Sequence, residues 1–177
     1  LKLVPFYKIQ DARYVVYWRK ESAKGFDELQ AKLAEEDAKE AKLAANTIDM
    51  VTPGEQQPES DHFMEKENSF TGINFNRHFR AATSWFSYKL TDKDKAAKKI
   101  SVTYFGTERN HKFSILINEQ ELVKVDLKDG KRDAFYTVEY DLPVDLKYDI
   151  NQAIKVKFKA ESGSTAGPVY EVRLSRN

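Results

Sequence analysis

The stretch AIKVKFKA, residues 153–160, decides the fold class of this chain. Apolar residues alternate with lysines along it: Ile154, Val156 and Phe158 against Lys155, Lys157 and Lys159. Because successive side chains of a β-strand point to opposite faces, this period of two predicts a strand with one face on a core and the other in water. The same alternation returns near the C-terminus, where Tyr170, Val172 and Leu174 alternate with Glu171, Arg173 and Ser175.

Further segments of this kind fill the second half of the sequence. They are rich in β-branched and aromatic residues and are separated by turn residues: SWFSYKL (84–90), ISVTYFG (100–106), HKFSILIN (111–118), ELVKVDL (121–127), AFYTVEYDLP (134–143), QAIKVKFKA (152–160) and PVYEVRLS (168–175). Short strands at this spacing, each with one core face, predict a mainly β protein built as an antiparallel β-sandwich or jelly roll.

The first part of the chain has a different composition. Residues 3–18, LVPFYKIQDARYVVYW, predict a strand segment, and residues 26–46 are dense in Ala, Leu, Glu and Lys, which predicts one α-helix. We therefore expect two parts. Residues 1–47 would be a strand segment and helix that connect to upstream domains outside this sequence, and residues 48–177 would be the β-sandwich domain.

The charge balance and the apolar runs exclude two classes of partner. Lys and Arg together number 29 and Asp and Glu 28, so no overall positive field attracts nucleic acid. No apolar run approaches the roughly 20 residues that span a bilayer, so we expect no membrane insertion. The sequence has no cysteine, which excludes a disulfide and a thiol nucleophile.

The segment TPGEQQPESDH, residues 52–62, gathers two carboxylates and a histidine: Glu59, Asp61 and His62. Paired carboxyl groups would suit a glycosidase, and histidine with carboxylates would suit zinc. Carboxylates alone would suit calcium, which jelly-roll modules often carry as a structural ion. The spacing matches no recognised ligand pattern and nothing else marks a substrate cleft. We therefore expect no catalytic residue and no metal cofactor here, with a structural calcium ion as the alternative.

The basic cluster NRHFR, residues 76–80, follows shortly after. Its arginines, Arg77 and Arg80, have the fork geometry that grips a carboxylate or a phosphate. An internal ion pair with Glu59 or Asp61 is the simpler interpretation. We expect a structural polar network that ties the segment to the domain, made of Glu59, Asp61, His62, Arg77 and Arg80.

Aromatic residues on two predicted strands are the candidates for ligand binding. Sugar-binding β-sandwiches use exposed aromatic rings as flat platforms, with polar groups nearby that fix the orientation of the sugar. Phe86, Tyr88 and Leu90 share one face of their strand and Trp85 lies on the other, so Trp85 is the first candidate and Tyr104 the second. The alternative is that these rings fill the core.

Several segments, taken in order, resemble a known family: PFYKIQDARYVVYW, TIDMVTPGEQQPESDH, SFTGINFNRHFRAATSWFSYKL, VTYFGTERNHKFSILINEQ and GPVYEVRL. They follow one another as in the C-terminal part of bacterial β-L-arabinofuranosidase-like glycoside hydrolases of the Bacteroidetes type, long catalogued as a domain of unknown function. The resemblance implies a multidomain parent with an upstream catalytic barrel, followed by galactose-binding-like β-sandwich domains. The catalytic cysteine and zinc site of that family belong to the barrel and have no counterpart in this sequence.

The expected function is therefore that of a non-catalytic C-terminal accessory module. It would brace the upstream catalytic domain and bind plant or host glycan, in the periplasm or outside the cell, as the resemblance implies. A purely structural or subunit-interaction domain without a ligand is the alternative. An independent hydrolase that uses Glu59 or Asp61 is the least favoured interpretation.

Overall fold

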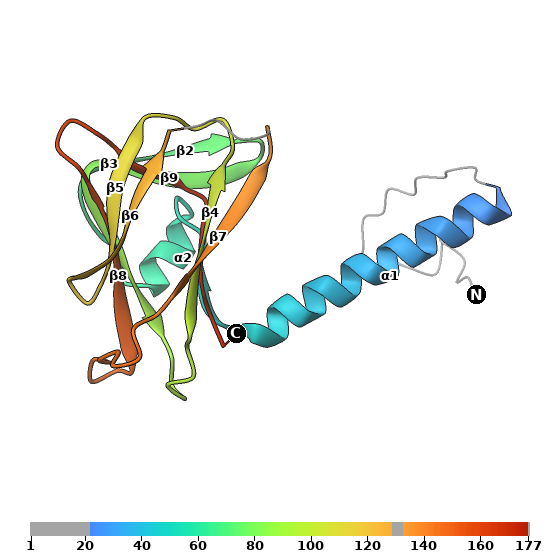
Figure 1. Ribbon diagram of the computed structural model, residues 1–177, viewed down its shortest axis with the longest axis horizontal. Helices are drawn as coiled ribbons and strands as arrows, with labels where there is room; N and C mark the ends of the chain where they lie inside the picture. Colours follow the sequence, from blue (N-terminus) through green and yellow to red (C-terminus); the bar gives the residue numbers. More distant parts are fainter. Residues whose placement is uncertain (1–21, 129–132, 177) are drawn as a thin grey trace, which may run out of the picture. The chain divides into compact units, whose positions relative to one another are not determined.

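The computed structural model describes residues 22–128 and 133–176 and divides the chain into two compact units, residues 1–41 and 42–177 (Figure 1). The strand segment predicted at residues 3–18 lies outside the described residues. The candidate site lies entirely in the second unit.

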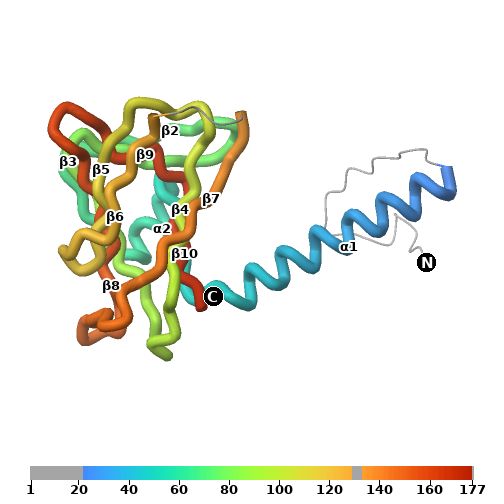
Figure 2. Tube along the Cα trace, in the orientation of Figure 1, coloured from blue at the N-terminus to red at the C-terminus, as the bar shows by residue number. Residues whose placement is uncertain are grey.

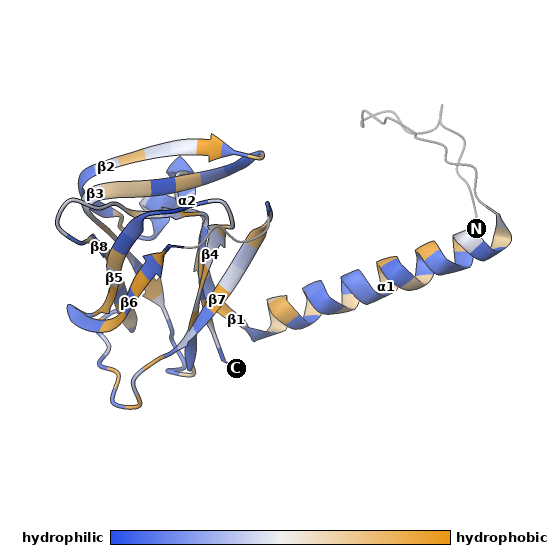
Figure 3. Ribbon diagram, turned by 45° about the horizontal axis from the view of Figure 1, so that its top comes forward, coloured by the Kyte–Doolittle hydropathy of each residue, from blue (hydrophilic) through white to orange (hydrophobic). Residues whose placement is uncertain are grey.

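Helix α1 (Ala23–Asn46) begins where Ser22 caps it, because the Ser22 hydroxyl accepts a hydrogen bond from the Gly25 backbone N–H at 3.0 Å. No residue of α1 is buried, and Figure 3 shows hydrophilic residues along most of the helix with hydrophobic ones between them. Lys39 and Glu35 form one of its surface ion pairs, at 2.6 Å. No helix in the described part of the chain is both long enough and apolar enough to cross a membrane.

Two antiparallel sheets form the second unit (Figures 1 and 2). The four-stranded sheet has the order β1-β10-β4-β7, and the six-stranded sheet has the order β2-β3-β8-β5-β6 with β9 paired to β3. The elements are β1 (Thr47–Val51), α2 (Gln56–Asp61), β2 (Glu65–Asn74), β3 (Arg77–Thr91), β4 (Lys99–Phe105), β5 (His111–Ile117), β6 (Gln120–Leu127), β7 (Phe135–Asp141), β8 (Ala153–Ala160), β9 (Ala166–Val169) and β10 (Glu171–Ser175).

The core lies between the two sheets and takes one face of each strand. The alternation read from residues 153–160 is confirmed, because Ile154, Val156 and Phe158 are fully buried and belong to a single hydrophobic cluster. Phe86 and Phe158 stack inside it with ring centroids 4.9 Å apart. The predicted fold class, a mainly β antiparallel sandwich with one long helix before it, is therefore confirmed.

Among the elements that were not predicted are β2, the first half of β3 and α2, and the absence of each from the prediction has a physical reason. Strand β2 and the first half of β3 contain no clean alternation, because this hairpin lies at the edge of the six-stranded sheet, where β3 is the one described strand that pairs with β2. A register shift between Glu67 and Ser69 breaks its periodicity further. Helix α2 has six residues and includes Pro58, so local propensity alone does not reveal it.

Candidate functional site

Glu59 and Arg80 form a buried ion pair that holds α2 against β3. Arg80 donates through Nε to Glu59 Oε1 and through Nη2 to Glu59 Oε2, each at 2.6 Å, and both side chains are almost completely buried. Glu59 Oε1 also accepts from the Gly54 N–H and from the Tyr88 hydroxyl, each at 2.8 Å. Burial raises the pKa of Glu59, but these hydrogen bonds outweigh burial and hold the pKa below its usual range.

His62 ties the end of α2 to β1 through a different partner. Its Nδ1 lies 2.6 Å from the Pro58 carbonyl oxygen and its Nε2 lies 3.1 Å from Asp49 Oδ1, an arrangement in which both ring nitrogens donate. The hydrogen bond to Asp49 raises the pKa of His62, although burial opposes it. Asp61 is exposed, and among the described residues it accepts a hydrogen bond only from Gln57 Nε2, at 2.8 Å, so it contributes little to the attachment of α2.

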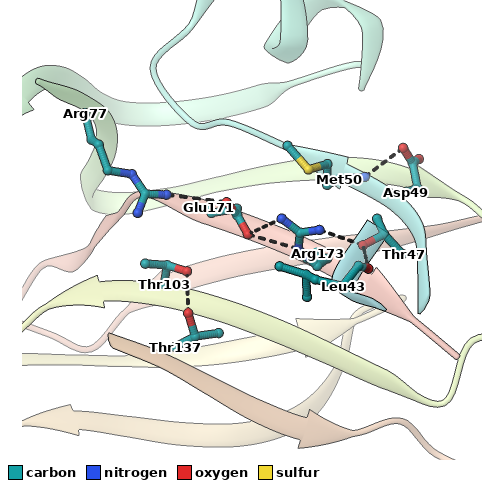
Figure 4. Close-up of polar contacts among 9 residues, drawn as sticks. All are labelled: Leu43, Thr47, Asp49, Met50, Arg77, Thr103, Thr137, Glu171 and Arg173. Carbon is teal, nitrogen blue, oxygen red and sulfur yellow. Dashed lines mark hydrogen bonds and ion pairs between the residues drawn. The ribbon is translucent and has the colours of Figure 1, made fainter. Parts of the chain in front are cut away.

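Arg77, the first residue of β3, belongs to a separate cluster with Glu171 and Arg173 of β10 in the four-stranded sheet (Figure 4). It pairs with Glu171 at 3.4 Å, and its guanidinium lies 4.6 Å from the centroid of the Phe135 ring. Glu171 also binds Arg173, which donates to the Thr47 hydroxyl at 2.6 Å. The expectation of a single network is therefore wrong. Four of the five predicted residues divide among Glu59–Arg80, His62–Asp49 and Arg77–Glu171, and Asp61 belongs to none of these pairs.

None of these clusters has the arrangement of a metal centre. In residues 22–128 and 133–176, no group of three or more His, Asp or Glu side chains is placed to hold a metal ion. The carboxylates of Glu59 and Asp49 instead accept hydrogen bonds from Arg80 and from the Thr91 N–H.

Tyr104, the second predicted sugar platform, is fully buried, so the expectation that its ring binds a sugar at the surface is wrong. Its side chain packs in the hydrophobic core between the sheets, with its ring centroid 6.2 Å from that of Phe113. The signal was present in the sequence, because Ile100, Val102 and Tyr104 alternate on one face of β4 and all three are in the core.

Trp85, the first predicted platform, is half-buried on the outer face of the six-stranded sheet. Its indole Nε1 donates to Glu67 Oε2 at 2.8 Å, and the Ser84 hydroxyl donates to the same oxygen at 2.7 Å. Lys157 Nζ lies 4.5 Å from the centroid of the indole ring, and Lys155 Nζ lies 5.7 Å from it. The ring is thus fixed in orientation and bordered by charged groups.

Ion pairs fix these lysines in turn. Lys157 donates to Glu119 Oε2 at 3.0 Å, and Lys155 donates to Glu65 Oε2 at 2.6 Å. The hydrogen bond with Glu65 raises the pKa of Lys155, and the bond with Lys157 lowers the pKa of Glu119. Carboxylates and ammonium groups of both signs therefore border the Trp85 ring.

Register shows which other residues share this face. Two rows of neighbouring residues cross five strands in the order β2, β3, β8, β5, β6: Glu67, Trp85, Lys159, Ser114 and Lys124 in the first, and Glu65, Ser87, Lys157, Leu116 and Glu121 in the second. We call these ten residues the outer-face rows. Among them, Ser87 is buried, and its hydroxyl has no hydrogen-bond partner in the described part of the chain.

Phe75 is an exposed aromatic ring that was not predicted as a site residue. It is 62% exposed, and its ring stacks on Phe105 with centroids 4.7 Å apart. Both Phe75 and Asn76, the two residues of the β2–β3 turn, have positive φ, at 47° and 59°. An aromatic residue rarely adopts a positive φ. This backbone conformation distinguishes Phe75, but it is visible in the structure and not in the sequence.

The fold places the protein in a class, the two-sheet antiparallel β-sandwich modules. Within it, the chain belongs to a family of unknown function, DUF6805, whose match covers residues 42–175. No protein of curated function matches the sequence.

Several solved structures are similar in fold at low sequence identity. The ANXUR1 extracellular domain from Arabidopsis thaliana is 14% identical with a TM-score of 0.50, over 72% of this chain and 41% of that one. A family 35 carbohydrate-binding module from Clostridium thermocellum is 13% identical with a TM-score of 0.48, over 71% and 96%. The exo-β-1,3-galactanase of Phanerochaete chrysosporium is 8% identical with a TM-score of 0.47, over 70% and 29%. The chain thus spans less than half of the first and third of these proteins.

Proposed function

We propose that this protein is a non-catalytic carbohydrate-binding module, and that Trp85 on the outer face of the six-stranded sheet is its sugar platform. The observation that carries the proposal is the setting of the ring. An indole held by its Nε1 bond to Glu67 keeps one orientation before the ligand arrives, which lowers the entropy cost of binding.

The polar groups at the border of the ring supply what a sugar requires. Lys155 and Lys157 present ammonium donors, and Glu67 presents carboxylate oxygens, of which only Oε2 accepts a hydrogen bond within the described part of the chain. An apolar face with donors and acceptors around it is the usual composition of a carbohydrate site, in which the ring contacts C–H groups and the charged side chains bind hydroxyls.

The sequence resemblance supplies the context of the proposal. As the C-terminal module of an arabinofuranosidase-like glycoside hydrolase, the domain would act beside an upstream catalytic domain of the same polypeptide, in the periplasm or outside the cell. It would hold that enzyme on a plant or host polysaccharide while the catalytic domain cleaves it.

Affinity electrophoresis tests the proposal. The full chain is run through gels that contain arabinan, galactan, xylan or mixed-linkage glucan, and we expect retardation by at least one polysaccharide. The Trp85→Ala variant should lose that retardation while its circular dichroism spectrum stays unchanged. Phe63→Ala is the matched control, because Phe63 is 69% exposed but does not belong to the outer-face rows. Migration unaffected by every polysaccharide would overturn the proposal and favour a structural brace.

A further inference from the structure

A pocket of about 430 Å³ opens on the same face as Trp85, two strands further along the sheet. It is lined by residues of β5, β6, β8 and the loop after β8: Ser114, Leu116, Glu121, Lys124, Lys159, Ala160, Glu161 and Ser162. Five of these eight belong to the outer-face rows. The pocket is therefore a continuation of the Trp85 surface and not a separate site.

A β-bulge builds the pocket wall on β6. Ile115 pairs with Val123 and Leu116 pairs with Glu121, so one extra residue is inserted in β6 at this point. Because of this insertion, Glu121 and Lys124 lie on the same face although they are three positions apart in the strand. In a regular strand they would point to opposite faces, and one of them would point into the core.

The chemistry of the pocket suits an uncharged polar ligand. Lys124 and Lys159 supply ammonium donors, and neither forms an ion pair with any described residue. Glu121 and Glu161 supply carboxylates, and Glu121 Oε2 accepts a hydrogen bond from the Ser114 hydroxyl at 2.7 Å. Two positive and two negative charges cancel, so the pocket has many donors and acceptors without attracting an ion of either sign.

Lys159 and Lys157 connect the pocket to the indole ring. Lys159 is the cross-strand neighbour of Trp85 and lines the pocket, whereas Lys157 lies over the ring and neighbours Leu116 in the pocket. From β3 to β6 the surface crosses three strand spacings, about 14 Å at about 4.8 Å per strand. This is more than one sugar ring covers.

We infer that this face binds an uncharged oligosaccharide chain laid across the strands, with one sugar ring on Trp85 and another in the pocket between β8 and β6. The inference rests on the proposed function, because it takes Trp85 as the first sugar platform. To the proposed function it adds the class of ligand: a neutral chain of several sugar units, in place of a single sugar or the end of a chain.

Isothermal titration of the full chain with oligosaccharide ladders tests the inference. The ladders contain from one to six units of arabinan, galactan and xylan, and oligogalacturonate provides the acidic comparison. Affinity for the bound neutral ladder should rise at least tenfold between the shortest and the longest members.

Lys124→Ala should remove most of this rise and leave the affinity for the shortest bound member unchanged, since Lys124 is the pocket residue farthest from Trp85 along its row. Trp85→Ala should weaken binding of every length.

Lys112→Ala is the matched control, because Lys112 lies on β5 but lines neither the pocket nor the ring. It should behave as the unaltered chain. Affinity that does not change with chain length, or a Lys124→Ala variant that weakens short and long members equally, would overturn the inference and leave the proposed function standing. Tighter binding of oligogalacturonate would overturn the assignment of an uncharged ligand. Absence of binding to every ladder would overturn the proposed function itself.

Discussion

At the residue scale, the Glu59–Arg80 pair is the interaction whose loss should cost most. In Glu59→Gln, the buried guanidinium of Arg80 keeps its charge but loses the carboxylate that compensates it. Removing one partner of a buried ion pair typically costs about 3–5 kcal/mol. We therefore expect the free energy of unfolding to fall by about that amount, measured by urea denaturation with linear extrapolation.

Asp61→Asn is the control for that variant, because Asp61 lies two residues further in the same short helix. It is exposed and accepts one hydrogen bond, from Gln57, so the unfolding free energy should change by less than about 0.5 kcal/mol. Equal losses in both variants would mean that the charge of α2, and not the buried pair, determines stability here.

The His62–Asp49 contact should make stability depend on pH in a defined direction. The hydrogen bond to Asp49 raises the pKa of folded His62 above its ordinary value of 6.5. Its contribution is therefore complete below that value and is lost as pH rises through the folded-state pKa. The pKa of Asp49 is lowered, because its hydrogen bonds to His62 and Thr91 outweigh burial, so the contribution of Asp49 is lost only as the solution becomes strongly acidic.

Urea denaturation at two pH values measures this effect. The difference in unfolding free energy between the unaltered chain and His62→Gln should be larger at about pH 5.5 than at about pH 8.5. In an Asp49→Asn background the His62→Gln difference should change less with pH, since the partner that contributes most to the raised pKa of His62 has lost its charge. A difference that grows toward alkaline pH would contradict this prediction.

The candidate site residues show what alternation alone can decide. It placed Trp85 on the face opposite to Phe86, Tyr88 and Leu90, and those three are fully buried. The same rule would have placed Tyr104 in the core, because it shares a face with Ile100 and Val102. Alternation could not predict that the pocket residues Glu121 and Lys124 share a face, because they do so only through a bulge in the pairing of β6 with β5. No periodicity in the sequence marks that bulge.

At the scale of elements, the sequence predicted the helices and strands that are stabilised by local propensity or by one buried apolar face. Strands β4 to β8 each have an apolar face, and α1 has many good helix formers. Helix α2 has neither property. It exists because Glu59 reaches Arg80, Tyr88 and Gly54, which lie in other elements. A six-residue segment that depends on tertiary contacts cannot be recognised from its own composition.

The β5–β6 turn tests how much of a hairpin depends on one residue. Asn118 and Glu119 both have positive φ, the conformation of a type I′ turn. The Asn118 side chain accepts from the Lys155 N–H at 2.8 Å and donates to the Lys147 carbonyl oxygen. Asn118→Gly should lose these two bonds, and Asn118→Ala should lose them and also strain the backbone. We expect the alanine variant to be less stable than the glycine variant by about 1 kcal/mol.

Thermal unfolding of the two variants measures this difference, and Gln120→Ala is the reference. Gln120 begins β6, is exposed and adopts no positive φ, so its replacement should change stability by less than about 0.5 kcal/mol. Equal stability of the alanine and glycine variants would show that the turn does not impose its conformation on residue 118.

At the scale of the whole molecule, the sequence predicted two packed sheets but not the order of their strands. Strands β10 and β4 are neighbours although about 70 residues separate them along the chain, and β8 lies between β3 and β5. Alternation fixes which face of each strand is buried, but it contains no information on which strand lies next to which. The outer-face rows depend on that order, so the sequence could identify Trp85 as a candidate but could not connect it to the pocket.

The sandwich should fold without residues 1–41. In the described part of the chain, every buried hydrophobic residue lies between Val51 and Leu174, and α1 contributes none. The attachments of the last turn of α1 are retained, because Arg176 N–H donates to the Asn46 carbonyl oxygen at 3.0 Å and the Thr47 hydroxyl donates to that of Leu43 at 2.7 Å. A chain of residues 42–177 should therefore unfold in urea at the same midpoint concentration as the full chain. The polysaccharide that retards the full chain should retard the shortened chain equally.

A lower midpoint would show that residues 1–41 stabilise the sandwich. Loss of retardation at an unchanged midpoint would show that residues 1–41 contribute to glycan binding.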